Sequence, residues 1–469
     1  MSRTPARLIS LAVATAAALT VAPAATATGS APAATATGSA PAATAGGSLS
    51  PAAAATATAT ASDPFYTYDG GEPLASFAPG TVLKTRTLQY HLVGIPTPLK
   101  AIQLLYRSTD AQGRPAANVT TVVRSLTGDG SKAVSYQSFY DSLDPEDGPS
   151  RAIAGDLTLG GVIPNAEALF MAPLLAKGYT LIIPDTQGQR ADFAAGPEYA
   201  TNTLDSIRAA TRSAATGMNA GTKVGLIGYS GGAIASGWAA ALAPSYAPDV
   251  NSRLVGFAEG GLLVAPAHNL KYVDGSLVWS GVIPMALIGV SRSYDIDLRQ
   301  YMNDYGRQVY DRLEDASIVD ALGRFPGLTW KKMAKPEYAN PNSVPEFVAA
   351  VNRVNLGSAP TPTAPGFIAQ GNGGVLEGTF GNPPGIGTGD AVMVAGDVRT
   401  LARQYCATGN DSITYRQYNL LSHTGVPVVW APLAMAWLDD RFEGRTAPSD
   451  CGRIPAGNSL APEQPAPLS

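Results

Sequence analysis

The sequence contains little charge and no long apolar run, and each scarcity argues against a class of function. Charged residues make up 14% of the 469 residues, and the formal net charge is only −4. A chain without a basic stripe neutralises few phosphates, so no nucleic acid is expected as a partner. No uninterrupted apolar run reaches the ~20 residues that a spanning helix needs, so no integral membrane span is expected.

The first residues have the pattern of an export signal. Arg3 and Arg7 precede the apolar stretch LISLAVATAAALTV, and small residues that suit cleavage follow it. The pattern predicts a signal peptide over residues 1–27 and a secreted, extracellular protein. A membrane anchor is the alternative, but the apolar stretch is short and runs into repeats rich in Ala, Pro and Thr.

Both ends of the expected domain are rich in small residues and proline. A nine-residue unit, APAATATGS, recurs with slight variation over residues 22–48. Such composition cannot bury a core, so residues 28–62 are predicted to be a disordered spacer. Residues 453–469 are predicted to form a loose C-terminal tail.

Cysteine is almost absent. A pair of cysteines, Cys406 and Cys451, in an exported chain predicts one disulfide. Closing a loop of about 45 residues would stabilise the fold by roughly 4 kcal/mol if the effect is entropic. Two free thiols are the alternative, but neither cysteine has a histidine beside it, so neither is expected to be a nucleophile.

The order of apolar patterns predicts an α/β fold. Strand-like segments come first, and strand-like and helical segments then alternate from about residue 166. This alternation predicts a mostly parallel central sheet with helices on both faces. The expected core comprises residues 63–263 and 365–452.

The alternation stops over residues 264–364, which are predicted to form an inserted helical cap. The apolar run 276–290 within it is short and interrupted by Pro284, so it is not expected to cross a bilayer. It is expected to pack over the sheet or to line an apolar pocket.

One serine lies where a nucleophile would be needed. The stretch KVGLIGYSGGAIASG contains G-x-S-x-G, with Ser230 between a predicted strand and a predicted helix. The motif alone is weak, but this context predicts a nucleophile elbow, with the Gly231 N–H directed at an oxyanion. A glycine turn made for compact packing is the alternative.

A serine hydroxyl needs a base, and the chain has three histidines. His423 follows the last predicted strand, where the chain order Ser, acid, His requires it. His91 and His268 are expected to be structural.

The orienting acid should follow the strand GFIAQG. Glu377, Asp390 and Asp397 are the candidates in this region. Asp390 is preferred because it lies in a glycine loop, whereas Asp397 opens a helix, where a carboxylate favours the helix dipole.

The chain resembles the secretory lipases of fungi and actinobacteria, a family of α/β-hydrolases. The resemblance rests on DPFY, SYQSFYDS, GYSGG, GDAVMVAGD and WLDDRF, and it spans nearly the whole mature chain. It implies an α/β-hydrolase fold with a cap or lid, and Ser230, Asp390 and His423 as the triad. It also implies an oxyanion hole from Asp141 and Gly231; Asp141 is assigned by the resemblance.

Together these features predict a secreted serine hydrolase that cleaves carboxylic esters, foremost a triacylglycerol lipase or esterase. The expected partner is a lipid or other acyl ester, including substrate at a lipid–water interface. No metal or organic cofactor is expected. A serine peptidase on the same fold and a non-catalytic secreted binding protein are the alternatives.

Overall fold

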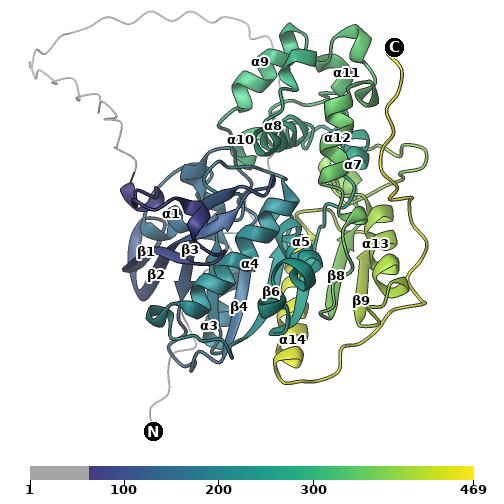
Figure 1. Cartoon of the computed structure of the whole chain (residues 1–469). Helices are drawn as coiled ribbons and strands as arrows, with labels where there is room; N and C mark the ends of the chain where they lie inside the picture. The colour runs from purple at the N-terminus through teal and green to yellow at the C-terminus, as the bar shows by residue number, and fades with distance from the viewer. Residues whose placement is uncertain (1–62, 469) are drawn as a thin grey trace, which may run out of the picture. The chain divides into compact units, whose positions relative to one another are not determined.

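The computed structural model describes residues 63–468; the expected signal peptide (1–27) and spacer (28–62) lie outside them. A nine-stranded sheet with the order β1-β2-β3-β5-β4-β6-β7-β8-β9 forms the centre (Figure 1). The strands are β1 (Val82–Leu92), β2 (Ile95–Thr109), β3 (Pro115–Val123), β4 (Lys132–Gln137), β5 (Thr180–Pro184), β6 (Lys223–Tyr229), β7 (Leu254–Gly260), β8 (Gly366–Gly371) and β9 (Ile413–Tyr418). β1, β2, β3 and β5 pair antiparallel, and β5-β4-β6-β7-β8-β9 pair parallel. The predicted mostly parallel sheet is confirmed.

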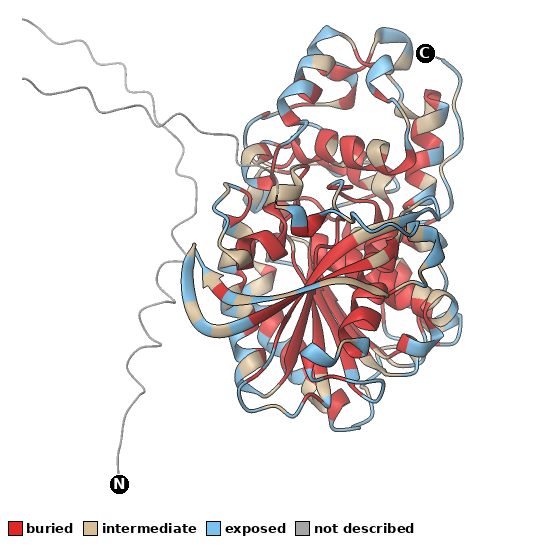
Figure 2. Ribbon diagram, turned by 60° about the vertical axis from the view of Figure 1, so that its left-hand side comes forward, coloured by how far each residue is buried: buried red, intermediate tan, exposed pale blue. Residues whose placement is uncertain are grey.

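Helices cover both faces of this sheet. The helices are α1 (Pro149–Ala154), α2 (Val162–Ala166), α3 (Ala168–Ala176), α4 (Gly196–Arg212), α5 (Gly231–Tyr246), α6 (Pro248–Asn251), α7 (Pro266–Val273), α8 (Val282–Tyr294), α9 (Asp304–Leu313), α10 (Ile318–Ala321), α11 (Trp330–Met333), α12 (Pro345–Arg353), α13 (Ala395–Ala407) and α14 (Val426–Phe442). Along β6, Leu226 packs in one hydrophobic cluster with α4, α5 and α13. Its neighbour Ile227 packs in another cluster with α3 and α14. Alternate side chains of a strand point to opposite faces, so the parallel strands are buried on both sides (Figure 2).

The segment between β7 and β8 supplies most of a separate hydrophobic cluster. Its helices α7 to α12 gather at one end of the sheet (Figure 1). Buried side chains of α8, α9 and α12 form one cluster there, which includes Leu287, Val309 and Phe347. Residues 297–322 contain two separate helices, α9 and α10, rather than one long helix. No helix within residues 63–468 is both long enough and apolar enough to traverse a bilayer.

The end of the chain is held by a disulfide and by packing. Cys406 on α13 and Cys451 are joined, as predicted, with their Cα atoms 5.6 Å apart. Beyond the disulfide, residues 453–468 contain no helix or strand, yet Leu460 is buried. Glu463 accepts hydrogen bonds from Lys271 Nζ and Asn342 Nδ2. These contacts hold the last residues along the helical segment, which differs from the loose tail that composition predicts.

Candidate active site

Ser230 lies in the sharp turn between β6 and α5. Its φ and ψ angles are 53° and −118°, a conformation that costs roughly 1–3 kcal/mol for a residue with a side chain. The Ser230 N–H donates to the Gly260 carbonyl of β7 at 2.9 Å, and the Ser230 carbonyl accepts from Ala233 N–H. The turn is therefore fixed from both sides, and it lies at the carboxyl edge of the parallel strands.

The glycines around Ser230 are required by close backbone contacts. A β-carbon at position 228 would lie 2.1 Å from the Gly232 carbonyl oxygen, and one at position 232 would lie 2.1 Å from the Gln137 carbonyl oxygen. Neither contact is possible, so side chains at these two positions would push α5 away from the sheet. The G-x-S-x-G spacing thus has a packing cause in this structure.

His423 connects Ser230 to Asp390 through hydrogen bonds. His423 Nε2 lies 2.7 Å from Ser230 Oγ, and His423 Nδ1 lies 2.8 Å from Asp390 Oδ2. The three side chains are 8%, 4% and 0% exposed, in the order Ser230, His423, Asp390. The structure therefore brings together the three residues that the sequence predicts as a triad.

The Asp390 side chain is positioned by donors from its own loop and from β8. Asp390 Oδ1 accepts from the N–H groups of Val392 and Met393 at 3.1 and 2.7 Å. Asp390 Oδ2 accepts from Gln370 Nε2 at 2.9 Å in addition to the imidazole. The His423 N–H also donates to the Asp390 backbone carbonyl at 2.7 Å, which ties the two loops together.

The other candidate acids have different partners. Asp397, in the first turn of α13, contacts His268 Nδ1 at 2.9 Å and accepts from Asn458. Glu377 accepts from the Thr424 N–H at 2.9 Å and from Trp279 Nε1 at 2.8 Å. Neither carboxylate bonds to His423, so the structure separates Asp390 from its two neighbours in the sequence.

The remaining histidines lie in structural contacts. His268 pairs with Asp397, as described, and His91 Nδ1 on β1 lies 3.2 Å from the Ile153 carbonyl. Neither imidazole is bonded to a serine, threonine or cysteine side chain within residues 63–468.

Asp141 and Gly231 lie against one another beside Ser230. A β-carbon at position 231 would fall 1.8 Å from Asp141 Oδ1, and both residues line the same pocket as Ser230. Asp141 has φ of 32°, and its carbonyl accepts from the Ile318 N–H at 2.7 Å, which anchors the turn after β4. Gly231 begins α5, so its N–H has no partner within the helix and lies at the positive end of the helix dipole.

The pKa values of two titratable groups at this site differ from their ordinary values. Burial raises the pKa of the Asp141 carboxyl to about 7, although the nearby His423 opposes this. Burial also disfavours the charged form of the His423 imidazole, but the carboxylates of Asp390, Glu377 and Asp141 together raise its pKa above the ordinary 6.5. The imidazole is therefore a stronger base than a free histidine.

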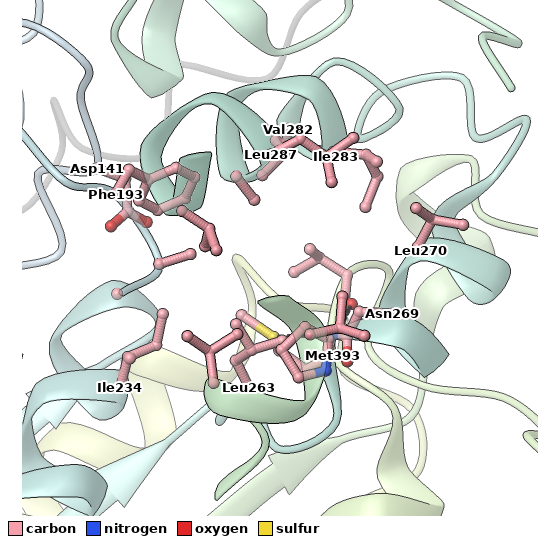
Figure 3. A pocket seen from close by; sticks show the side chains of 18 of the residues that line it. Asp141, Phe193, Ile234, Leu263, Asn269, Leu270, Val282, Ile283, Leu287 and Met393 are labelled. Carbon is pink, nitrogen blue, oxygen red and sulfur yellow. Dashed lines mark hydrogen bonds between the residues drawn. The ribbon is translucent and has the colours of Figure 1, made fainter. Parts of the chain in front are cut away.

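An apolar pocket opens from Ser230 into the helical segment. The cavity is narrow, with about 80 Å³ open to the centre of a water molecule. Asp141 and Phe193 lie at one end of it, and Asn269 and Met393 lie across the cavity from them (Figure 3). Most of its wall is apolar, including Ile234, Leu263, Val282, Leu287, Phe347 and Val351. As predicted, the run 276–290 lines an apolar pocket, through α8 and the residues before it.

Sequence reasoning missed the contacts that surround the imidazole. Trp279 packs edge-on against the His423 ring, with the ring centroids 5.0 Å apart, and Glu377 accepts from the indole N–H. Tyr229 donates its hydroxyl hydrogen to the His423 carbonyl at 2.6 Å. The place of Tyr229 in the G-x-S-x-G motif, next to Ser230, could have indicated that it lies near the site. Trp279 lies 144 positions from His423 in the sequence, so no sequence signal indicates their contact.

Comparison with known sequences finds a lipase family and proteins named as lipases. A family described as secretory lipase matches residues 155–379 and 384–450. Lipase 5 of Candida albicans is 31% identical over 415 residues, which cover 85% of this chain and 84% of that protein. A Mycobacterium tuberculosis protein named a probable inactive lipase is 32% identical over 390 residues, which cover 82% of each chain.

A solved structure has the same fold. The X-ray structure of Candida antarctica lipase A aligns with a TM-score of 0.72, and the alignment covers 85% of this chain and 89% of that one. The two sequences are 22% identical, so the likeness is evidence of fold alone. It confirms the α/β-hydrolase fold that the sequence predicts.

Proposed function

Because the chain belongs to the secretory lipase family, we propose that it is a secreted lipase or esterase in which Ser230, His423 and Asp390 act as a catalytic triad. The observation that carries the proposal is the pair of hydrogen bonds at His423, 2.7 Å to Ser230 Oγ and 2.8 Å to Asp390 Oδ2. A hydroxyl within bonding distance of an oriented imidazole is the arrangement that activates a serine nucleophile.

In the proposed reaction Ser230 Oγ attacks the carbonyl carbon of an ester. His423 Nε2 takes the serine proton and then gives it to the departing alkoxide, so that an alcohol leaves and an acyl-serine remains. A water molecule, deprotonated by the same imidazole, attacks the acyl-serine and releases the carboxylic acid. Asp390 stays ionised throughout and stabilises the imidazolium that forms in each half of the reaction.

The proposed oxyanion hole consists of the backbone N–H groups of Asp141 and Gly231. Each such donor contributes roughly 3 to 4 kcal/mol to stabilising the transition state. Both residues line the pocket beside Ser230, which supports this assignment.

Hydrolysis assays on soluble and insoluble esters test this function. We expect turnover of p-nitrophenyl esters and of emulsified triglyceride, with no release of peptides from casein. Peptide release without ester turnover would favour a peptidase on this fold. If folded protein hydrolyses neither esters nor peptides, a non-catalytic binding protein is favoured. One relative is named a probable inactive lipase.

The apolar pocket leads to a prediction about acyl chain length. Each added CH₂ that enters the pocket contributes about 0.8 kcal/mol, or roughly a fourfold gain in kcat/KM. We expect kcat/KM to rise from acetyl to medium-chain p-nitrophenyl esters. Leu287→Asp should lower the decanoyl rate at least tenfold more than the acetyl rate, because only the long chain reaches the α8 wall.

Leu433→Asp is the matched control, since this leucine is 50% exposed on α14 and does not line the pocket. Its chain-length profile should follow that of the wild type. A flat wild-type profile, or equal losses on both esters in folded Leu287→Asp, would place acyl binding elsewhere. Trp279→Asp should depress both rates, because this side chain touches His423 as well as the pocket.

The pH dependence follows from the environment of His423. The reaction needs a neutral imidazole, and the neighbouring carboxylates favour its protonated form, so the acid limb of kcat/KM should have its midpoint above pH 6.5. Glu377→Gln removes one of these negative charges and should move the midpoint to lower pH. A pH series with a soluble short-chain ester measures the shift.

Glu443→Gln provides the control for the loss of one carboxylate. Glu443 follows the last residue of α14, whereas His423 precedes its first, and a 17-residue helix is about 25 Å long. At that distance the charge is screened, so the midpoint should stay in place. Equal midpoints for wild type and Glu377→Gln would contradict the assignment of the acid limb to His423.

A further inference from the structure

The wall of the apolar pocket contains one polar side chain that the proposed reaction does not use. Asp141 and Ser230 also line the pocket, but both belong to the reacting end. Asn269, on α7, lies across the cavity from Asp141 and is 4% exposed (Figure 3). Leucine at this position would bind a purely hydrocarbon ligand more tightly, because it has nearly the same shape as asparagine and no polar atoms to desolvate.

The orientation of the Asn269 amide is set by its neighbours. Asn269 Nδ2 donates to the Val392 carbonyl at 2.5 Å and lies 3.5 Å from Met393 Sδ. A carbonyl only accepts, so the amide nitrogen must face Val392 and the amide oxygen must face away from it. Among the described residues, Asn269 Oδ1 has no hydrogen-bond partner.

A buried acceptor without a donor is rare in native proteins, because its lost hydration costs free energy that no hydrogen bond offsets. A bound water would satisfy it poorly, because buried waters make about three hydrogen bonds. The side chains that line the pocket beside it, such as Leu270 and Met393, offer no donor. A hydroxyl carried by the substrate chain needs no such additional partners, because the chain itself holds it in place.

We propose that Asn269 selects acyl esters whose chain bears a hydroxyl group, with Asn269 Oδ1 accepting the hydroxyl hydrogen. The proposal rests on the proposed function, since it requires that the acyl chain occupies the pocket that begins at Ser230. Because Asn269 lies across the cavity from Asp141, the hydroxyl belongs beyond the first carbons of the chain. The substrate class is therefore esters of hydroxylated fatty acids, and plain chains remain substrates through their apolar contacts.

The test compares p-nitrophenyl decanoate with decanoates that carry one hydroxyl at successive positions from C3 to C10. For the wild-type protein we expect a hydroxyl to depress kcat/KM at most positions and to be neutral or favourable at one. Asn269→Leu should lower the ratio of hydroxylated to plain ester at that position about tenfold. A merely structural role, in tying α7 to the Val392 loop, would lower both rates equally and leave the ratio unchanged.

Leu287→Val is the control, because it changes the volume of the same pocket without touching the amide. Its hydroxyl ratio should match that of the wild type. A uniform penalty at every position in the wild-type protein overturns the proposal, even if Asn269→Leu fails to fold. No hydrolysis of any ester, plain decanoate included, would instead overturn the proposed function.

Discussion

Ser230→Ala is expected to lower kcat for ester hydrolysis by about 10⁵-fold or more, with the fold intact. The reason is that the hydroxyl is the proposed nucleophile, and the members of a triad act as a unit, so the loss of one removes nearly the whole effect. Alanine accepts the same backbone angles as serine, and the turn is held by backbone bonds to Gly260 and Ala233. The thermal midpoint should therefore stay near that of the wild type.

His423→Ala should have a loss of similar size, and the double variant should be scarcely worse than either single one. Non-additivity of this kind distinguishes a cooperating pair from two residues that each disturb the fold. Turnover of folded Ser230→Ala within tenfold of the wild type would remove Ser230 from the reaction.

Asp390→Asn is expected to lower kcat by about 10⁴-fold. The substitution keeps the size of the side chain but removes the charge that stabilises the imidazolium, and it reverses the hydrogen bond that selects the tautomer of His423. The donors that surround the carboxylate, Gln370 Nε2 and the N–H groups of Val392 and Met393, would then face an uncharged group. Stopped assays at high enzyme concentration measure a loss of this size.

Asp397→Asn is the matched control for the acid. Asp397 lies seven positions along the chain, is equally buried, and contacts His268 rather than His423. Its replacement should change the rate by no more than a few fold, although stability can fall because the contact with His268 weakens. The reverse ranking of the two variants would transfer the role of the orienting acid to Asp397.

The sequence predicts the parts of the site that follow local rules. Ser230 could be assigned because a tight turn between strand and helix needs glycine at positions 228 and 232, and the sequence has glycine at both. His423 could be assigned because the fold requires the order Ser, acid, His along the chain, and only one of the three histidines follows the candidate acids. The parallel sheet could be predicted because strands buried on both faces read as continuous apolar runs.

Other parts depend on tertiary contacts that no local pattern encodes. Asp141 has no motif of its own, and its place beside Gly231 follows from the turn after β4 meeting the start of α5. Glu377 and Asp390 read alike as acids in a glycine-rich loop, and only the hydrogen bond to His423 separates them. The contact between α7 and the loop at Val392 likewise leaves Asn269 Oδ1 without a hydrogen-bond partner among the described residues, which no local pattern indicates.

The end of the chain shows the same limit. Residues 453–469 are rich in proline and polar side chains, a composition typical of loose tails. The described part is nevertheless held by Asn352, which accepts from the Glu463 N–H, and by the burial of Leu460. Composition indicates whether a segment can form its own core, but it does not indicate whether another core will bind it.

A fluorophosphonate bonds covalently to a serine that an adjacent base has activated, so labelling shows directly whether Ser230 is the nucleophile. The wild-type protein should take up one equivalent, and peptide mass analysis should place the added mass on Ser230. Labelling should vanish in Ser230→Ala, fall steeply in His423→Ala, and slow when an ester substrate competes. Folded wild-type protein that stays unlabelled, or label found on another residue, would contradict the assignment of Ser230 as the nucleophile.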